Sequence, residues 1–324
     1  MNYEYLPDGK HVDCYAVIRS TEVKVDKNGN DYLIATVGDN TSSISAKMWK
    51  YNEAPVKDFK AGDFVKIRGV KDIYNGEDQL KIEKMRRVDP EMDPDVNITD
   101  FVPSACLPGE VMMAEIEQVV HAFSDDDFKQ VVFAILAKYR DRLIYWPAAK
   151  MMHHSVNGGL LMHTLSMLRI AQAVAGVYSF VNYDLLCAGV ILHDVCKIEE
   201  IGSNSIGLAG DYTVKGNLIG HLVLGAMEID RVGRELGLDE EKMMLLEHML
   251  ISHHGVPEFG AAKYPGFVEA QILSSIDDMD AKVYEINELM NKVEPGKDVR
   301  TNGTLDFRTI YNHGLQNDGG VELM

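Results

Sequence analysis

The spacing of hydrophobic residues changes once along the chain, from a strand-like pattern to a helical one. Up to about residue 90, apolar and polar residues alternate in short runs rich in Val, Ile and Tyr, which predicts β-strands. The first two runs flank Asn28-Gly29, a dipeptide typical of a β-hairpin turn. The runs cover residues 14–26, 31–39, 42–50, 63–74 and 78–88. Five short strands, with a longer connection between the third and the fourth, predict a small closed or partly open β-barrel.

From residue 109 to about residue 292, apolar residues recur every three or four positions, which predicts amphipathic helices. Ser124 is followed by three aspartates, and a capping side chain with negative charge favours a helix start. Four glycines interrupt the pattern between residues 199 and 216, where we expect a loop or a short hairpin. The expected helices cover residues 109–123, 125–143, 158–178, 183–196, 217–236, 239–254 and 267–291. The second part of the chain is therefore predicted to be all-α.

Two further segments lack a clear period and define the domain boundaries. Residues 89–108 contain four of the ten prolines and no helical periodicity, which is typical of a linker. The last thirty residues show a weak pattern and are expected to form a partly ordered tail. The predicted fold is multidomain, with a small all-β barrel followed by an all-α helical bundle. Its boundaries are 1–90 for the barrel, 91–108 for the linker, 109–292 for the bundle and 293–324 for the tail.

Charge is distributed unevenly between the two domains. The 324 residues carry a net charge of −18, yet residues 1–90 hold 15 basic and 15 acidic residues. The remaining 17 basic and 35 acidic residues therefore carry the whole excess. An acidic domain repels nucleic acid unless bound cations reverse the local field. If the second domain acts on nucleic acid, we expect divalent cations at its working site.

The composition also argues against several classes of protein. No apolar run approaches the roughly 20 residues of a membrane span, and the N-terminus lacks a basic stretch followed by an apolar core. The cysteines are widely spaced without a CxxC pair, which argues against a disulfide framework or a cysteine-rich zinc site. We therefore expect a cytoplasmic protein with no membrane partner and with free thiols at Cys14, Cys106, Cys187 and Cys196.

Histidines are concentrated in the second domain, at the ends of apolar segments. Four segments, "GGLLMHTLSML", "VILHDVCK", "GNLIGHLVLG" and "LISHHGVP", place a histidine directly after residues expected to face the core. The segment "ILSSIDDMDA" does the same for an aspartate. Burying such groups costs several kcal/mol unless they are paired or bound to metal, and helical bundles build metal sites from them. The eight clustered histidines are His153, His154, His163, His193, His221, His248, His253 and His254.

Residues 145–290 resemble the HD-domain superfamily, whose signature is a histidine, an adjacent His-Asp pair and a distal aspartate. Two additional histidines between the pair and the last aspartate mark the members that hold two metals, and this sequence has both. The resemblance implies that one metal is held by His163, His193, Asp194 and Asp277, with Asp194 as the bridge, and the second by His221 and His253. His254 is an alternative second-metal ligand, because the sequence cannot separate it from His253.

Nearly the whole chain resembles the YhaM family of bacterial 3′-to-5′ exoribonucleases. The resemblance rests on an OB-like N-terminus, the linker, "YWPAAKMMHHSVNGGLLMHTLSMLRIA", "GHLVLG", "SHHGVPEFGAAKYPGFVEAQIL" and "IDDMDAKV". Two departures are Cys196, where the family often has glycine, and Met162, where glutamate is common. The resemblance implies a metal-dependent enzyme that releases 5′-mononucleotides from single-stranded RNA, with single-stranded DNA as a further substrate. A homo-oligomer is also compatible with the family.

Two other functions remain open from the sequence. One is an HD-type phosphohydrolase that acts on nucleotides or cyclic nucleotides. The other is a non-catalytic nucleic-acid-binding protein with a structural metal site. The segment after "HH" is not of the "DGxGYP" type, which argues against a cyclic-di-GMP phosphodiesterase.

The expected chemistry is phosphodiester hydrolysis at two metals bridged by Asp194. Lys197 follows His193 by one helical turn, so we assign it to a non-bridging phosphate oxygen; the alternative is a solvated lysine at a helix end. His154 and His254 are candidates for substrate contact or leaving-group protonation. Four imidazoles and two carboxylates suit Mn, Fe, Co or Zn better than Mg, and we expect Mn²⁺ at both sites, with iron as the main alternative.

The first domain offers candidates for nucleic-acid binding. Aromatic side chains stack on bases and basic side chains contact phosphates in single-strand-binding barrels. Each aromatic residue has a core position as its alternative, since alternation does not show which face is exposed. The stacking candidates are Tyr15, Tyr32, Trp49 and Tyr74, and the phosphate-binding candidates are Lys47, Lys50, Lys66, Arg68 and Lys71.

Overall fold

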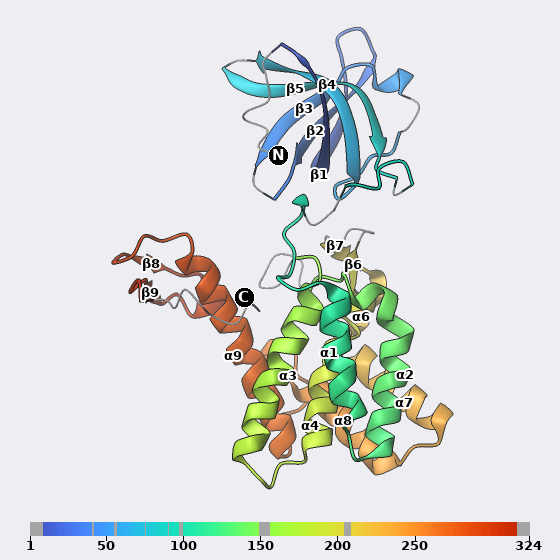
Figure 1. Ribbon diagram of the computed structural model, residues 1–324, viewed down its shortest axis with the longest axis vertical. Coiled ribbons are helices and arrows are strands. Elements are labelled where there is room, and N and C mark those ends of the chain that lie inside the picture. Colours follow the sequence, from blue (N-terminus) through green and yellow to red (C-terminus); the bar gives the residue numbers. More distant parts are fainter. Residues whose placement is uncertain are drawn as a thin grey trace. The chain divides into compact units, whose positions relative to one another are not determined.

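The computed structural model describes residues 9–40, 42–54, 57–74, 76–89, 91–96, 100–148, 156–203 and 209–315. These residues form two compact units (Figure 1). One comprises the described residues up to Ser104, and the other begins at Ala105. Each unit has its own hydrophobic core.

The first unit is a closed five-stranded barrel, as the sequence predicts (Figure 1). Neighbouring strands follow the order β1-β2-β3-β5-β4 around it. All pairs are antiparallel except β3 with β5, which run parallel over a short stretch. A 3-10 turn, η2 (Tyr51–Glu53), follows the third strand. The strands are β1 (His11–Val25), β2 (Asp31–Gly38), β3 (Ser43–Met48), β4 (Phe64–Tyr74) and β5 (Glu77–Arg87).

Part of the predicted linker packs on the barrel. Asp93 is buried and accepts hydrogen bonds from the Tyr15 hydroxyl at 2.9 Å and from both terminal nitrogens of Arg86 at 2.6 and 2.8 Å. Lys66 lies 3.3 Å from the same carboxylate. The Arg86 guanidinium, above all, holds the pKa of Asp93 well below its usual range. The compact barrel unit therefore extends beyond residue 90, because this buried charge takes its partners from β1, β4 and β5.

The second unit is helical, again as predicted. Its core is formed around α3 and α4, which are largely buried. The glycine-rich segment forms a short hairpin, β6 (Ile201–Ser203) with β7 (Ala209–Tyr212). The helices are α1 (Gly109–His121), α2 (Asp126–Leu143), α3 (Gly159–Val177), α4 (Tyr183–Leu192), α5 (Lys197–Glu200), α6 (Val214–Ile219), α7 (His221–Leu236), α8 (Glu240–Ser252) and α9 (Val268–Met290).

Two helix boundaries differ from those expected, and both differences bear on the histidines. The helix expected over 217–236 is divided at Gly220, whose φ of 78° departs from helical geometry, so that α7 begins at His221. The helix expected over 183–196 ends at Leu192, and His193 to Cys196 form a turn. These breaks place His193 and Asp194 after the end of one helix and His221 at the start of another.

The described part of the C-terminal segment is ordered. Residues Asp298–Arg300 (β8) pair with Thr309–Tyr311 (β9) around a 3-10 turn at Gly303–Leu305. Asn312 donates to the main-chain oxygens of Met290 and Val293, which ties this hairpin to the end of α9. Residues 316–324 of the predicted tail lie outside the described residues.

One helix of the described chain, α3, is long and apolar enough to cross a membrane by length and composition alone. Of its apolar window, 56% is buried inside the helical unit. It also contains His163, whose side chain is buried at the metal-ligand cluster described below. These features are those of a core helix.

Candidate metal centre

Five elements bring the predicted ligands to one buried place. His163 comes from the first half of α3, and His193 with Asp194 follow the end of α4. His221 begins α7, and His253 with His254 follow the end of α8. Asp277 comes from the middle of α9. The apolar faces of these helices fill the core, and this packing brings seven candidate ligands from distant parts of the sequence into one cluster.

The first group of ligand atoms contains His163, His193 and Asp277, which offer donors within 4.8 Å of one another. His163 Nε2 lies 3.2 Å from Asp277 Oδ1 and 3.3 Å from His193 Nε2. Asp194 Oδ2 faces the same group, 3.3 Å from His193 Nε2 and 3.8 Å from His163 Nε2. The four residues assigned to the first metal are thus adjacent.

The second group contains His221, His253 and His254, whose donors also lie within 4.8 Å of one another. Asp194 turns its other oxygen to this group, with Oδ1 3.2 Å from His221 Nε2 and 3.7 Å from His253 Nε2. Asp194 therefore presents one oxygen to each group, as a bridging carboxylate must. The geometry brings His254 into the group beside His253, instead of making the two histidines alternatives.

Hydrogen bonds fix the orientation of each imidazole. The Nδ1 atoms of His193 and His253 lie 2.7 Å from the main-chain oxygens of Val190 and Leu250. A carbonyl oxygen can only accept, so each Nδ1 carries a proton, and in the neutral imidazole each Nε2 then keeps its lone pair. Nδ1 of His254 lies 2.8 Å from the carbonyl of Phe259 and is protonated for the same reason. In this tautomer the Nε2 atoms of His193, His253 and His254 are the nitrogens available to a metal.

Three buried atoms at the centre have no hydrogen-bond partner among the described residues, namely Asp194 Oδ1, His221 Nε2 and His253 Nε2. An unpaired buried polar atom costs about 1–3 kcal/mol, and here three such atoms lie together at one centre. A metal cation would satisfy all of them at once. The donor set therefore fits divalent metal ions, with His163, His193, Asp194 and Asp277 around one and His221, His253, His254 and Asp194 around the other.

Two carboxylates support the ligands and were not identified from the sequence. Asp280 Oδ2 lies 2.7 Å from His163 Nδ1, and Ser166 also donates to this carboxylate. Glu200 Oε2 lies 2.7 Å from His221 Nδ1. Each group thus contains one histidine supported by a carboxylate, an arrangement that raises ligand basicity. Asp280 could have been found from its position three residues after Asp277 on the same helix, whereas Glu200 shows no comparable signal.

The electrostatic environment affects the pKa of each ligand differently. Burial would raise the pKa of Asp194, but Lys197 and His193 outweigh it and hold that pKa well below its usual range. Burial lowers the pKa of His163, yet Asp277 and Asp280 more than compensate and raise it to about 10. For His253, burial and the neighbouring His193 place the pKa well below its usual value. The potential that attracts a proton to His163 would equally attract a metal cation.

Lys197 lies directly beside the bridge. Its Nζ is 2.6 Å from Asp194 Oδ2, and the side chain is only 18% exposed. Burial lowers the pKa of Lys197, but the charge of Asp194 outweighs it and the net effect is a raised pKa, so the ammonium stays charged. This position contradicts the alternative of a solvated lysine at a helix end. Contact with a phosphate oxygen of the substrate stays a prediction.

The remaining site predictions of the helical unit have different outcomes. His154, the third predicted catalytic residue, and His153 lie outside the described residues. The two departures from the family pattern, Met162 and Cys196, are both buried in the core. Burial raises the pKa of the Cys196 thiol to about 12, so it packs as a neutral side chain.

Four of the predicted nucleic-acid-binding residues of the barrel gather on one surface. The rings of Tyr32 and Trp49 stack with centroids 4.7 Å apart, and Trp49 is 45% exposed. Lys47 Nζ lies 5.6 Å from the Trp49 ring and 4.8 Å from the ring of Tyr74, which is also exposed. We call these four residues the aromatic cluster. Strands 2 and 3 and the loops beside them form the usual binding face of this barrel type.

The other predicted barrel residues are engaged within the unit. Tyr15 is half-buried; its ring contacts Phe101 and its hydroxyl binds Asp93, so packing occupies this aromatic residue. Arg68 forms two hydrogen bonds with Asp13, at 2.9 and 2.8 Å, while its side chain stays half exposed. Lys71 is buried and pairs with Asp78 at 2.8 Å. Alternation along the strands could not separate these positions from the aromatic cluster.

Models of two protein families match the two units. A model described as an OB-fold nucleic acid binding domain matches residues 13–88, and the HD domain model matches residues 160–282. A third model, described as a candidate helicase, matches residues 108–182, but the chain has no GxxxxGK[ST] phosphate-binding loop. A solved OB-fold domain of replication protein A from Methanococcus maripaludis is 18% identical and covers 28% of this chain and 96% of its own, with a TM-score of 0.22.

Curated relatives match nearly the entire chain. The 3′-5′ exoribonuclease YhaM of Bacillus licheniformis is 34% identical over 303 residues, which is 94% of this chain and 95% of the relative. The protein of the same name from Bacillus subtilis is 33% identical over the same shares of both chains. Similarity at this level extends through both units and the segment between them. The chain therefore belongs to the YhaM family of 3′-5′ exoribonucleases, with an OB-fold unit followed by an HD-domain unit.

Proposed function

We propose that this chain is a metal-dependent 3′-5′ exoribonuclease that removes 5′-mononucleotides from single-stranded RNA. The observation that carries the proposal is the pair of buried ligand groups that share the two oxygens of Asp194. Relatives named as 3′-5′ exoribonucleases across 94% of the chain support the same reaction.

Each residue of the centre has a chemical task in this proposal. When bound, two divalent ions would supply the hydroxide and the Lewis acidity for phosphodiester hydrolysis. Asp194 holds the two positions at a fixed spacing, since its rigid carboxylate presents one oxygen to each. Lys197 neutralises Asp194 and donates toward a non-bridging phosphate oxygen, where its charge stabilises the transition state. Asp280 and Glu200 hold the rings of His163 and His221 in place.

We propose Mn²⁺ as the working metal. Five imidazoles and two carboxylates make a nitrogen-rich donor set, which suits Mn, Fe, Co or Zn and is a poor match for Mg²⁺. Iron is the main alternative. Measuring turnover and bound metal after reconstitution with each ion separates these choices.

In this proposal the barrel unit holds the substrate strand. The stacked Tyr32–Trp49 pair, with Tyr74 and Lys47 beside it, offers an aromatic platform and a positive charge, the two elements of sequence-independent single-strand binding. Single-stranded DNA satisfies the same contacts and stays an alternative substrate. The cytoplasmic location and a homo-oligomer stay predictions from the sequence.

The direct test uses single-stranded RNA labelled at its 5′ end, and the same RNA labelled uniformly. With Mn²⁺, uniformly labelled RNA should yield only 5′-mononucleotides from the start, while the 5′ label stays on a shortening strand. A chelator should stop the reaction, and single-stranded DNA and cyclic nucleotides serve as competing substrates. Hydrolysis of nucleotides but not of RNA would instead indicate a phosphohydrolase, and stoichiometric metal without any turnover would indicate a structural site.

A further inference from the structure

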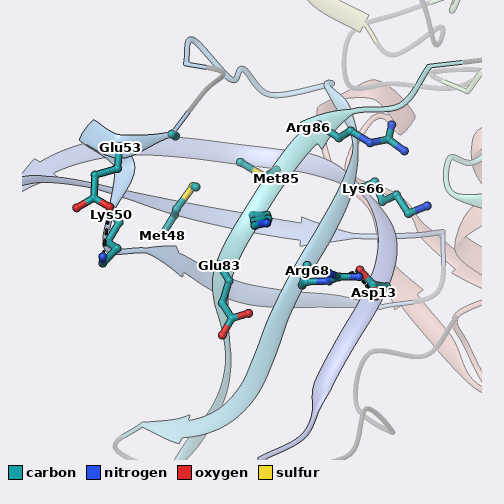
Figure 2. A pocket seen from close by; sticks show the side chains of 11 residues that line it. Asp13, Met48, Lys50, Glu53, Lys66, Arg68, Glu83, Met85 and Arg86 are labelled. Carbon is teal, nitrogen blue, oxygen red and sulfur yellow. Dashed lines mark hydrogen bonds and ion pairs between the residues drawn. The ribbon is translucent and has the colours of Figure 1, made fainter. Parts of the chain in front are cut away.

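The barrel has a pocket of about 550 Å³ apart from the aromatic cluster (Figure 2). Its walls come from β1, β4, β5 and the end of β3 with the η2 turn, where β3 and β5 separate beyond Lys47 and Lys81. The size is within the usual range of small-molecule sites. The lining residues are Asp13, Met48, Lys50, Glu53, Ala54, Lys66, Arg68, Glu83, Lys84, Met85 and Arg86.

The floor of the pocket is apolar, whereas its rim is charged. Met48 and Met85 belong to the barrel core, and Figure 2 shows them between the Lys50–Glu53 pair on one side and the basic side chains of β4 and β5 on the other. Methionine is flexible and polarisable, so it adapts to flat ring surfaces. Five basic and three acidic residues line the pocket, which gives it a positive balance in a chain of net charge −18.

A β-bulge shapes the rim at Lys84. Arg68 pairs with Lys84 and Gly69 pairs with Ile82, so Glu83 is an extra residue in β5. As a result both Glu83 and Lys84 are exposed, although they are neighbours in a strand. A Cβ at Gly69 would lie 2.4 Å from the Lys81 carbonyl oxygen, so the close approach of the two strands here requires glycine. The bulge is therefore specified by the sequence.

The cations of the rim differ in their partners. Arg68, Lys50 and Arg86 have carboxylate partners at 2.8, 3.2 and 2.6 Å. Lys66 and Arg86 share the single carboxylate of Asp93, so one of their two positive charges is not neutralised by it. The side chain of Lys84 forms no hydrogen bond or ion pair within the described part of the chain. An anion entering the pocket would meet Lys84 without displacing a carboxylate.

The pocket and the aromatic cluster are neighbours along the chain. Trp49 of the cluster lies between Met48 and Lys50, which both line the pocket. Consecutive Cα atoms are about 3.8 Å apart, so the backbone segment that carries the exposed Trp49 ring also forms one wall of the pocket. The pocket thus combines a charge for a phosphate, a soft apolar floor for a base and a neighbouring stacking surface.

We propose that this pocket is a nucleotide subsite, in which Lys84 contacts a phosphate and the base rests on Met48 and Met85. The occupant is a nucleotide unit of the single strand held by the aromatic cluster, so the proposal rests on the proposed function. A free 5′-mononucleotide, the product of the proposed reaction, has the same chemistry. The experiment separates these two sources.

The test measures binding to the full-length chain in the presence of a chelator, so that no RNA is cut. The probes are a labelled oligouridine of about 16 nucleotides and uridine monophosphate. The salt dependence of oligouridine binding is measured as the slope of log K against log[salt]. Lys84→Ala should reduce the size of this slope by about 0.7, which is the contribution of one phosphate contact on a single strand. Lys84→Arg should keep the wild-type slope. Lys60→Ala, an exposed lysine of the same unit that does not line the pocket, is the matched control.

A second variant tests entry of the base without changing charge. Ala54 lines the pocket and has an extended backbone conformation, which accepts a larger side chain. The leucine of Ala54→Leu should fill the pocket and weaken oligouridine binding about fivefold or more. Weaker binding of uridine monophosphate alone would assign the pocket to the free product. If Lys84→Ala and Ala54→Leu bind both probes as wild type does, the pocket proposal fails. The proposed function would still stand in that case, provided that the wild type binds and cleaves RNA. Absence of RNA binding and cleavage by the wild type would reject the proposed function itself.

Discussion

The two units treat buried charge in opposite ways. In the barrel unit, Asp93 is buried, but Arg86, Lys66 and Tyr15 surround it and complete its interactions. In the helical unit, Asp194 is equally buried, yet its Oδ1 faces the Nε2 atoms of His221 and His253 and has no hydrogen-bond partner among the described residues. A buried carboxylate with a full set of partners, such as Asp93, stabilises the fold. A buried carboxylate with an unpaired oxygen, such as Asp194, requires an added cation. The comparison separates a structural ion cluster from a metal centre without reference to the reaction.

The largest effect should come from changing the unsatisfied carboxylate. Asp194→Asn replaces one of its two oxygens with an amide group that cannot bind metal, so RNA cleavage should fall by more than about 10³-fold, because loss of one stabilising donor alone costs about 10²–10³. RNA affinity in the presence of chelator should stay unchanged, since the aromatic cluster is in the other unit. Cleavage assays and fluorescence anisotropy measure the two effects. Asp278→Asn, an exposed neighbour of Asp277, is the control, and substantial turnover by Asp194→Asn would refute the bridging role.

Lys197 tests whether the bridge needs its positive neighbour. Lys197→Ala should lower kcat by about 10²-fold, since the ammonium is absent from both Asp194 and the phosphate oxygen. The control is Lys215→Ala, which removes a more exposed lysine paired with Glu199. Single-turnover rates at saturating metal and RNA measure the effect. Equal rates for wild type and Lys197→Ala would remove this residue from the mechanism.

The carboxylates behind the histidines should have a smaller effect, on metal binding. Asp280→Asn and Glu200→Gln keep a hydrogen-bond acceptor but lose the charge, so each should weaken metal affinity by about 10–100-fold. Titration calorimetry of metal-free protein measures this loss directly. Glu199→Gln changes an adjacent carboxylate that binds Arg142 and Lys215, and should have no such effect. Wild-type metal affinity in both variants would show that the rings are held by packing alone.

The metal centre could be predicted from the sequence because its residues interrupt an apolar pattern. His193 and Asp194 follow "VIL" at a position where a core residue is expected, and the same is true of His221 and His253. The helical periodicity of the sequence also predicted the all-α fold class of this unit. Periodicity says nothing of partners in space, however, so it did not identify Asp280 or Glu200 as supports of the ligands. It likewise could not show that His253 and His254 both belong to the second group.

The barrel shows the reverse situation. Its five strands followed from alternation and turn residues, but the outer positions of a strand look alike whether they bind a ligand, form an ion pair or pack on another segment. Tyr15 and Trp49 are both outward-facing aromatics in the sequence, yet only Trp49 is free to stack on a base, because Asp93 and Phe101 cover Tyr15. The residues that decide this difference lie 78 or more positions away along the chain, and local pattern contains no information about them.

Trp49 allows a test of the barrel's own function. Trp49→Ala removes the exposed member of the stacked pair, and stacking on one base is worth about 1–3 kcal/mol. RNA affinity should therefore fall about 5- to 150-fold, while kcat at saturating RNA stays near wild type because the metal centre is untouched. Met92→Ala, an exposed apolar residue of the same unit, is the control. If Met92→Ala and Trp49→Ala bind RNA equally well, the aromatic cluster is not the binding surface.

The smallest effect concerns Asp93 and appears only with pH. Its folded pKa is lowered by Arg86 below the unfolded value of about 4, so its contribution to stability is fully present above pH 4. That contribution is lost as the pH falls through the folded pKa. The urea midpoint of the barrel unit should therefore be lower in Asp93→Asn than in wild type at pH 7, and the gap should narrow progressively as the pH falls below about 4 toward the folded pKa. The chain has two tryptophans, one in each unit, so Trp49 fluorescence in a Trp146→Phe background reports on the barrel alone. If the difference in urea midpoint stays constant down to strongly acidic pH, Asp93 stabilises the barrel through packing and its charge contributes nothing. That result would remove the contrast with Asp194.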